Sequence, residues 1–254
     1  MDYSKLTDFT GKTVFVSGSS RGIGEQIVRA FAVNGADVIV SSRDQGKCEE
    51  IAASIVEDGG KARAKACHAG RMADVTAVFD WIKEEYGKLD VLVNCGGTNP
   101  FFGKIGDTPE VAFDKTIDVN LKGPMYLSAE AVKLMKEKGG AIVNVASING
   151  ISPGLLQGVY SMTKSAMINM TKAYALEYAA DNIRVNAICP GFVDTNMTKV
   201  FTSNPQLMDV LAEKIPMARA AQPEEMVGGV LYLASDAASY TTGTTLVMDG
   251  GYTA

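Results

Sequence analysis

The sequence predicts one α/β domain in which helices cover both faces of a doubly wound parallel sheet. Short apolar runs rich in β-branched residues alternate along the chain with longer segments that have helical spacing. The runs are continuously apolar, which is typical of strands that are buried on both faces. A length of 254 residues with 46% hydrophobic residues suits one large domain.

Six strands are expected, and they lie at Thr13–Ser17, Asp37–Ser41, Leu89–Asn94, Ala141–Ala146, Arg184–Ile188 and Thr245–Met248. The helices expected between them span Ile23–Asn34, Gln45–Glu57, Asp74–Tyr86, Pro109–Lys138, Tyr160–Ala180 and Pro223–Ser235. No linker or low-complexity segment marks a second domain, so residues 1–254 are expected to fold together. Sheets of this kind bind ligands beyond the carboxyl ends of their strands.

Composition excludes several classes of function. The one histidine, His68, leaves no imidazole cluster for a metal, and the four cysteines have no CxxC spacing, so neither metal nor disulfides are expected. A net charge of −5 argues against nucleic acid or an anionic membrane as the main partner. No apolar run approaches the roughly 20 residues of a membrane span, and the first residues lack a secretory pattern. A cytoplasmic protein is therefore expected.

A glycine-rich loop follows the first expected strand. Glycine permits a sharp turn, a close approach to a pyrophosphate and tight packing of the next helix, whose first N–H groups favour an anion. The loop therefore predicts a dinucleotide site, formed by Gly18, Ser20, Arg21, Gly22, Ile23 and Gly24.

The end of the second expected strand indicates which dinucleotide binds. NAD enzymes carry an acid there, about 20 residues beyond the glycine loop, that bonds the ribose 2′-hydroxyl. This chain has Ser42 and Arg43 instead, and Arg43 with Arg21 can bind a 2′-phosphate through paired hydrogen bonds. The alternative is two solvated surface arginines. NADP(H) is favoured.

A tyrosine and a lysine begin the helix expected at Tyr160–Ala180. Tyr160 and Lys164 lie four residues apart and so share one helix face. A free phenol has a pKa near about 10, and a neighbouring ammonium favours the phenolate. Lowering the phenol pKa by about 3 units requires roughly 4 kcal/mol. The pair predicts a proton-exchanging group, although the same spacing also occurs on purely structural helices.

Together these residues resemble the classical short-chain dehydrogenases/reductases. The matching elements occur in order over nearly the whole chain: Gly18-x-x-x-Gly22-Ile23-Gly24, Asn94-Cys95-Gly96-Gly97, Asn120, Ser147, Tyr160-x-x-x-Lys164 and Pro190-Gly191. The resemblance implies a Rossmann-like single domain, with a cofactor half at about 1–145 and a catalytic and substrate half at about 146–254.

The resemblance also implies a catalytic tetrad. Tyr160 would exchange the proton with the substrate oxygen, and Lys164 would lower its pKa and bond the nicotinamide ribose. Ser147 would orient the substrate oxygen, and Asn120 would hold a water that links the lysine to solvent. Further cofactor contacts are implied at Asn94, Gly96, Pro190, Gly191, Val193 and Thr195. A polar residue at 42 followed by a basic one is similar to the NADP(H)-preferring branch.

Two departures from the family pattern concern the cofactor. Asn94-Cys95-Gly96-Gly97 stands where the family has Asn-Asn-Ala-Gly. His68 stands where most members carry an acid near the adenine; it is expected to bond or stack on the base, and the alternative is a loop histidine without function. The segment Asn99–Gly103 with Cys67-His68 is similar to animal carbonyl reductases of the peroxisomal type, but the final residues do not resemble a Ser-Lys-Leu address.

Apolar residues of the expected substrate loops predict a pocket for a ketone or secondary alcohol with a hydrophobic body. They are Phe101, Phe102, Ile151, Leu155, Leu156, Met197 and Phe201. Residues Asn196–Met217 are expected to form a lid. The alternative for each residue is simple packing of that lid.

A free small-molecule carbonyl reductase is favoured over a 3-oxoacyl-[acyl-carrier-protein] reductase, because the catalytic helix ends in acidic residues at Glu177 and Asp181. A polyol or sugar dehydrogenase and a non-enzymatic NADPH-binding regulator are the other hypotheses. A homotetramer is expected from the resemblance, and from Met162, Met167, Met170 and Tyr174, which make this helix apolar around much of its circumference.

Overall fold

Seven parallel strands form one sheet in the order β3-β2-β1-β4-β5-β6-β7. The computed structural model describes residues 5–199 and 213–254. The strands are β1 (Thr13–Ser17), β2 (Asp37–Ser41), β3 (Lys61–Ala64), β4 (Val91–Asn94), β5 (Gly140–Val145), β6 (Ile183–Pro190) and β7 (Thr245–Met248). The predicted doubly wound α/β class is confirmed.

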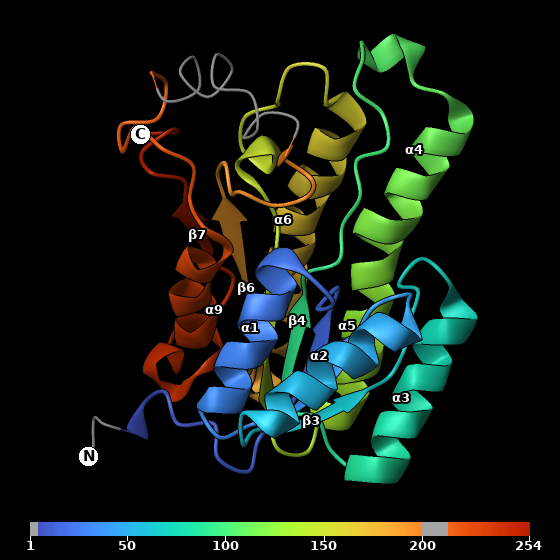
Figure 1. Ribbon diagram of the computed structural model, residues 1–254, viewed down its shortest axis with the longest axis vertical. Helices are drawn as coiled ribbons and strands as arrows, with labels where there is room; N and C mark the ends of the chain where they lie inside the picture. Colours follow the sequence, from blue (N-terminus) through green and yellow to red (C-terminus); the bar gives the residue numbers. More distant parts are fainter. Residues whose placement is uncertain (1–4, 200–212) are drawn as a thin grey trace.

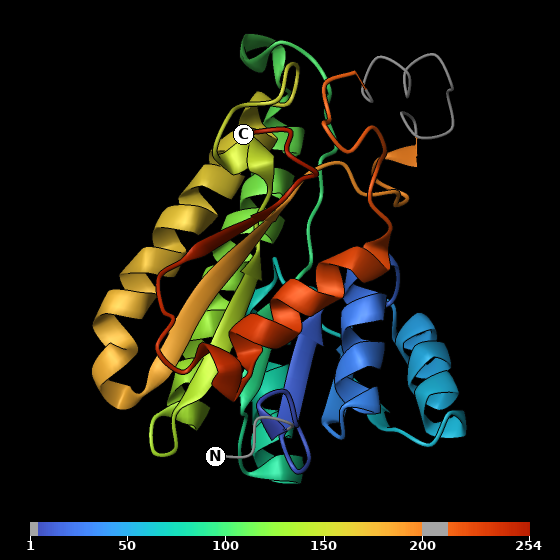
Figure 2. The same cartoon turned by 90° about the vertical axis from the view of Figure 1, so that its left-hand side faces the viewer.

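Helices cover both faces of the sheet (Figure 1). They are α1 (Gly22–Val33), α2 (Gln45–Glu57), α3 (Met72–Tyr86), α4 (Glu110–Ile117), α5 (Gly123–Met135), α6 (Gly158–Tyr178) and α9 (Val227–Ala234). The core residues of α1, α2 and α9 pack on one face, and those of α3, α5 and α6 pack on the other. Figure 2 shows β6 and β7 lying between α6 and α9.

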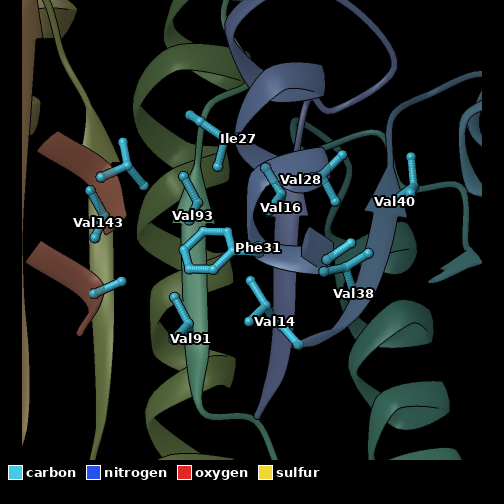
Figure 3. Packing of buried hydrophobic residues seen from close by; sticks show 14 of the residues in the cluster. Val14, Val16, Ile27, Val28, Phe31, Val38, Val40, Val91, Val93 and Val143 are labelled. Atoms are coloured by element: carbon cyan, nitrogen blue, oxygen red, sulfur yellow. The ribbon is translucent and has the colours of Figure 1, made fainter. Parts of the chain in front are cut away.

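Alternate residues of the central strands supply the two cores, because successive side chains of a strand point to opposite faces. Val14 and Val16 of β1 pack with Phe31 of α1, and Phe15 packs with Phe79 of α3. Figure 3 shows Phe31 among the valines of β1 and β4. Burial of each such side chain stabilises the fold by about 1.5–3 kcal/mol, which explains why these runs are continuously apolar.

The strand order reverses between β1 and β4, and this reversal positions the site. The chain leaves β1 toward β2 and β3 on one side, and it continues from β4 toward β5, β6 and β7 on the other. The chain therefore leads from β1 to α1 on one face of the sheet and from β4 to α5 on the other, and sheets of this kind bind ligands in the crevice at the carboxyl ends of these strands. The C-terminus lies at the same end of the molecule (Figure 1).

Strand β3 is absent from the sequence prediction. Its residues, Lys61-Ala-Arg-Ala64, alternate between exposed and half-buried, because β3 is an edge strand with one partner. Lysine and arginine on an edge strand also discourage pairing with another chain. A search for continuously apolar runs therefore missed it.

The helix predicted at Pro109–Lys138 is present, but it is not one regular α-helix. The structure has α4, a π-helical turn at Asp118–Lys122, and then α5. Pro124 has no N–H to donate to the carbonyl of Asn120, four residues earlier, so a regular α-helix is interrupted there. Similarly, the helix predicted at Pro223–Ser235 begins as a 3₁₀ turn at Pro223–Met226 before α9.

Candidate functional site

The loop after β1 makes the sharp turn that its glycines predict. Gly18 has a φ of +73°, and a Cβ there would lie 2.6 Å from the backbone of Gly96 in the loop after β4. A Cβ on Gly24 would lie 2.4 Å from the carbonyl oxygen of Gly18. Both positions therefore require glycine. Arg21 precedes α1 in an extended conformation and its side chain does not cap the helix, so the first N–H groups of α1 are available to an anion.

Ser19 joins the loops after β1 and β2, and the sequence analysis did not single it out. Its buried hydroxyl donates to the Val16 carbonyl at 2.7 Å and accepts from the Ser41 N–H at 2.8 Å. The Ser19 N–H donates to the Ser41 carbonyl at 3.0 Å. These bonds hold the glycine loop against the end of β2, where Ser42 and Arg43 follow.

Two arginines lie exposed on these joined loops. Within the described residues, the side chains of Arg21 and Arg43 have no hydrogen-bond or ion-pair partner. Ser42, which directly precedes Arg43, is half-buried, and its Oγ accepts a hydrogen bond from the Asp44 N–H at 3.3 Å. Two cations without a counter-charge fit the predicted 2′-phosphate better than a ribose hydroxyl.

His68 lies beside the end of β2, because the neighbouring Cys67 N–H donates to the Ser42 carbonyl at 2.8 Å. The His68 backbone N–H donates to Asp74 Oδ2 at 3.1 Å. Its Nδ1 is buried without a hydrogen-bond partner. The position suits the predicted contact with the adenine, which stays a prediction.

The side chain of Asn94 does not reach the crevice. It is fully buried, and its Nδ2 donates to Asn144 Oδ1 at 2.8 Å and to Ser128 Oγ at 3.1 Å. This network joins β4 to β5 and α5 below the site. A cofactor contact at this position is therefore restricted to the backbone of Asn94, while Gly96 lies against Gly18 in the crevice itself.

The segment after β6 brings Thr195 to the glycine loop. Pro190 ends the strand, Gly191 packs tightly against the backbone after β7, and Val193 is buried. A Cβ added to Gly22 would lie 3.6 Å from Thr195 Cγ2. Of the predicted contacts in this segment, Thr195 is thus the one whose side chain faces the predicted pyrophosphate site.

Ser147, Tyr160 and Lys164 come together at the carboxyl end of β5. The Lys164 ammonium lies 5.7 Å from the centre of the Tyr160 ring and donates to the Val145 carbonyl at 2.7 Å. The Ser147 side chain lies close enough to the Tyr160 phenol to favour its ionised form. Helix α6 supplies the tyrosine and lysine one turn apart, and the 3₁₀ turn that begins after Ser147 supplies the serine.

Burial dominates the titration of this group. Burial raises the pKa of Tyr160 to about 12, although the nearby Ser147 side chain favours the phenolate. Burial lowers the pKa of Lys164 to about 8. The expected acidification of the phenol by its lysine neighbour is therefore not produced by the protein's own groups. They keep the phenol protonated at neutral pH, which suits a proton donor.

Asn120 lies in the π-helical turn and fixes the loop after β4. Its Oδ1 accepts from the Thr98 N–H at 2.8 Å, and its Nδ2 donates to the Thr98 carbonyl at 2.8 Å. The fully buried amide also lies 3.3 Å from Thr163 Oγ1. The Asn120 side chain is thus hydrogen-bonded within the protein. The predicted water contact would therefore be made by the backbone carbonyl of Asn120, because Pro124, four residues later, has no N–H to donate to it.

Two thiols near Lys164 also escaped the sequence analysis. Cys95 and Cys189 are close enough for their charges to act on the ammonium, and the Ser147 backbone bonds to Cys189. Burial raises the pKa of Cys95 to about 12 and that of Cys189 to about 11. Both groups stay protonated near neutral pH and fill space beside the lysine.

The predicted substrate residues that the structure describes lie on the loops after β4 and β5, except Met197, which lies in the segment after β6. The Gly103 N–H donates to the Leu156 carbonyl at 3.0 Å and joins the loops, and the Phe101 ring packs on Gly103. Phe102 is 49% exposed, Met197 43% and Leu155 88%. Leu155 therefore lies at the rim rather than in an enclosed pocket.

The expected lid falls largely outside the described residues. Residues 200–212, which include Phe201, belong to that part. Asn196–Lys199 and Glu213–Met217 are described, and the second stretch is joined to the end of the sheet, since the Met217 N–H donates to the Gly250 carbonyl at 3.1 Å.

Two further findings concern only the part of the chain that the structure describes. It contains no cluster of histidine, cysteine and acidic side chains suited to a metal ion. None of its helices has the length and apolarity needed to cross a bilayer.

Comparisons with known proteins agree with this geometry. A family model described as enoyl-(acyl carrier protein) reductase matches residues 18–253. The rabbit (Oryctolagus cuniculus) protein "Dehydrogenase/reductase SDR family member 4" is 36% identical over 241 residues, which are 94% of this chain and 93% of that protein.

Solved structures give the same result. A gluconate 5-dehydrogenase from Burkholderia cenocepacia J2315, in complex with NADP and tartrate, superposes with a TM-score of 0.95 at 26% identity, covering 98% of each chain. A short-chain type dehydrogenase/reductase from Mycobacterium marinum has a TM-score of 0.92 at 34% identity, again over 98% of each chain.

Proposed function

The chain belongs to the classical short-chain dehydrogenase/reductase family and is an NADP(H)-dependent alcohol/ketone oxidoreductase, and on that premise we propose that it is a carbonyl reductase. Its substrate would be a small ketone or secondary alcohol with a hydrophobic body. The observation that supports the chemistry is the single cluster of Ser147, Tyr160 and Lys164 at the carboxyl end of β5. The observation that supports the substrate is the number of exposed apolar side chains on the loops after β4 and β5, among them Phe102 and Leu156.

The protein's own atoms fit NADP(H). In the proposed arrangement the pyrophosphate lies on the glycine loop and the first turn of α1. Arg21, Ser42 and Arg43 hold the 2′-phosphate, and the unpaired arginines are the chemical reason. In this proposal His68 lies at the adenine end, and Thr195, which lies beside Gly22, contacts the cofactor on the nicotinamide side of the pyrophosphate.

The proposed mechanism assigns one task to each buried polar group. Bound NADPH supplies the hydride to the carbonyl carbon. Tyr160 donates its phenolic proton to the carbonyl oxygen, and its raised pKa keeps that proton in place until the reaction. Ser147 bonds the same oxygen and so aligns it with the phenol. Lys164, fixed by the Val145 carbonyl, stabilises the phenolate that remains.

Another hypothesis is a 3-oxoacyl-[acyl-carrier-protein] reductase. The argument against it, that acidic residues at the end of the catalytic helix disfavour this substrate, does not hold. Glu177 lies 17 residues along α6 from Tyr160, which is about 25 Å at the rise of an α-helix. The acidic end of the helix is therefore remote from the site entrance, and that alternative stays open. A polyol or sugar dehydrogenase is the second candidate, since the superposing Burkholderia enzyme is a gluconate 5-dehydrogenase.

A substrate panel tests the proposal. NADPH oxidation is followed with aromatic ketones, acetoacetyl thioesters and keto-sugars. We expect the highest kcat/KM with the ketones. Tyr160→Phe should lower the rate by at least about a hundredfold, because general acid catalysis contributes about 10²–10⁴. NADPH binding by the variant, measured by fluorescence, should be retained. If the unmodified chain and Tyr160→Phe are both inactive toward every substrate but still bind NADPH, the result would instead support a regulatory protein.

A homotetramer is part of the proposal. Exposed apolar side chains lie on α4 and α6, with Val111 80% and Leu176 83% exposed, and also near β7, where Tyr240 is fully exposed and Val247 39% exposed. Met167, expected at the same surface, is fully buried in the core and carries no such role. Two apolar surfaces fit an assembly with two kinds of interface. The cytoplasmic location stays a prediction.

A further inference from the structure

Two carboxamides join the substrate loops next to the catalytic tyrosine. Asn99 Nδ2 in the loop after β4 donates to Gln157 Oε1 in the loop after β5 at 3.0 Å. The backbones of Gly103 and Gln157 pair at the same place. Both amide side chains are only half-buried.

The position of this pair relative to the reacting groups is fixed from both sides. Gln157 is the residue immediately before α6, three residues ahead of Tyr160, so it lies on the tyrosine side of the helix. Asn99 follows Thr98, whose N–H and carbonyl are both held by Asn120. A Cβ on nearby Gly97 would lie 3.8 Å from Lys164 Nζ.

The bond between the two amides leaves the nitrogen of Gln157 and the oxygen of Asn99 without a partner. Within the described residues, neither Gln157 Nε2 nor Asn99 Oδ1 has a hydrogen-bond partner, and neither is a buried unsatisfied atom, so both reach solvent. A nitrogen that donates and an oxygen that accepts together match a hydroxyl group, which accepts and donates at once, whereas a carbonyl oxygen only accepts.

The surroundings favour a neutral hydroxyl over a carboxylate. In the stretches 97–104 and 148–157, which are both described, the single charged residue is Lys104, and its side chain is exposed. The remaining neighbours are mainly apolar, including Phe101 and Leu156. A carboxylate would call for a paired cation in such a wall, and a hydroxyl does not.

We propose that the Asn99–Gln157 amide pair binds a hydroxyl group adjacent to the reacting carbonyl. The substrate class is then an α-hydroxyketone, or a vicinal diol in the oxidative direction, and Gln157 is a specificity-determining residue. This inference rests on the proposed function, because it assumes reduction of a carbonyl at Tyr160.

A matched pair of ketones tests the assignment. The two are 2-hydroxy-1-phenylpropan-1-one and 2-methyl-1-phenylpropan-1-one, which differ by a hydroxyl in place of a methyl group. We expect Gln157→Leu to lower kcat/KM for the hydroxyketone by about threefold to tenfold, the loss for one neutral hydrogen bond. The kcat/KM for 2-methyl-1-phenylpropan-1-one should change by less than about twofold, within the effect of a surface substitution. Asn99→Leu should show the same selectivity.

Controls separate a specific effect from a general one. Gln157→His keeps an N–H donor and should retain part of the preference for the hydroxyketone. Ser152→Ala removes a polar group from an exposed position of the same loop and should leave kcat/KM for both ketones unchanged. NADPH affinity and the circular dichroism spectrum should match those of the unmodified enzyme. An equal loss for both ketones would overturn the specificity role while leaving the proposed function intact. Inertness of the unmodified enzyme toward every ketone would overturn the proposed function itself.

Discussion

At the scale of single residues, burial decides the chemistry of the site. Tyr160 and Lys164 face each other as the four-residue spacing predicts, yet burial moves their pKa values in opposite directions, to about 12 and about 8. Each shift favours the neutral form of its group. A sequence pattern can place an ammonium near a phenol, but it cannot state how much water the fold removes from them.

The pH dependence of stability tests the buried ammonium. The folded pKa of Lys164, about 8, lies below the ordinary lysine value of 10.5, so the unfolded chain binds more protons between these two pH values. The cost of burial is complete below about pH 8 and disappears above about pH 10.5. Lys164→Met should therefore gain stability relative to the unmodified chain, and this gain should shrink by about 2 kcal/mol from pH 7 to pH 9.5. Urea unfolding at both pH values measures it, and a pH-independent difference would contradict a lowered pKa.

Arg43 tests the preference for NADP(H). Arg43→Ala should weaken NADPH binding by about 10- to 100-fold, since a hydrogen bond to a charged group contributes about 1.5–3 kcal/mol. NADH binding should change little. Fluorescence titration with both cofactors gives the comparison, and Lys83→Ala, which removes an exposed charge from α3, is the control. Equal weakening for both cofactors would place Arg43 away from the 2′-phosphate.

At the scale of elements, loop-to-loop contacts place the predicted residues. Ser19 holds the loop after β1 to the end of β2, and Asn120 holds the loop after β4 from a π-helical turn. The turn arises at Pro124, which interrupts the regular helix. These contacts position the arginines and the backbone beside Lys164 without contributing to any strand or helix pattern.

Because the loops after β1 and β4 are in contact at Gly18, a methyl group added at this residue should lower both stability and NADPH affinity. In Gly18→Ala the Cβ would lie 2.6 Å from the Gly96 backbone at a φ of +73°. Backbone strain alone should cost about 1–3 kcal/mol of unfolding free energy, and NADPH affinity should fall as the loops separate. Gly11→Ala, at a similar φ of +75° and with no atom within 4 Å of the added Cβ, is the matched control. Similar stability of the two variants would show that the loops do not touch.

At the scale of the whole molecule, apolar surface remains after both faces of the sheet are covered. Leu176 on α6 is 83% exposed and Val111 on α4 is 80% exposed. The two helices pack against each other. Leu176 lies near the end of α6, far along the helix from Tyr160, so its burial in an assembly would not cover the reacting groups.

If the proposed tetramer covers Leu176, a charged side chain at this position should prevent assembly. Leu176→Glu should dissociate the proposed tetramer of 26.9 kDa chains, because an unpaired carboxylate is costly to bury at an interface. Light scattering coupled to size exclusion gives the mass. Val33→Glu, at a position of α1 that is 85% exposed, should leave the mass unchanged. A monomeric unmodified chain would refute the tetramer directly.

The sequence by itself determined the sheet, the glycine loop and the tyrosine–lysine pair. Burial on both faces requires apolar runs, as in β1 and β2, and these two strands and the less buried edge strand β7 were predicted with the bounds observed. The positive φ of Gly18 requires glycine, so that signal is also local. Only the tertiary structure decided the rest: the edge strand β3, the inward direction of Asn94, the clamps at Ser19 and Asn120, and the pKa of Tyr160. Each of these depends on which distant segment lies alongside, and contacts between segments far apart in the chain leave no period in the sequence.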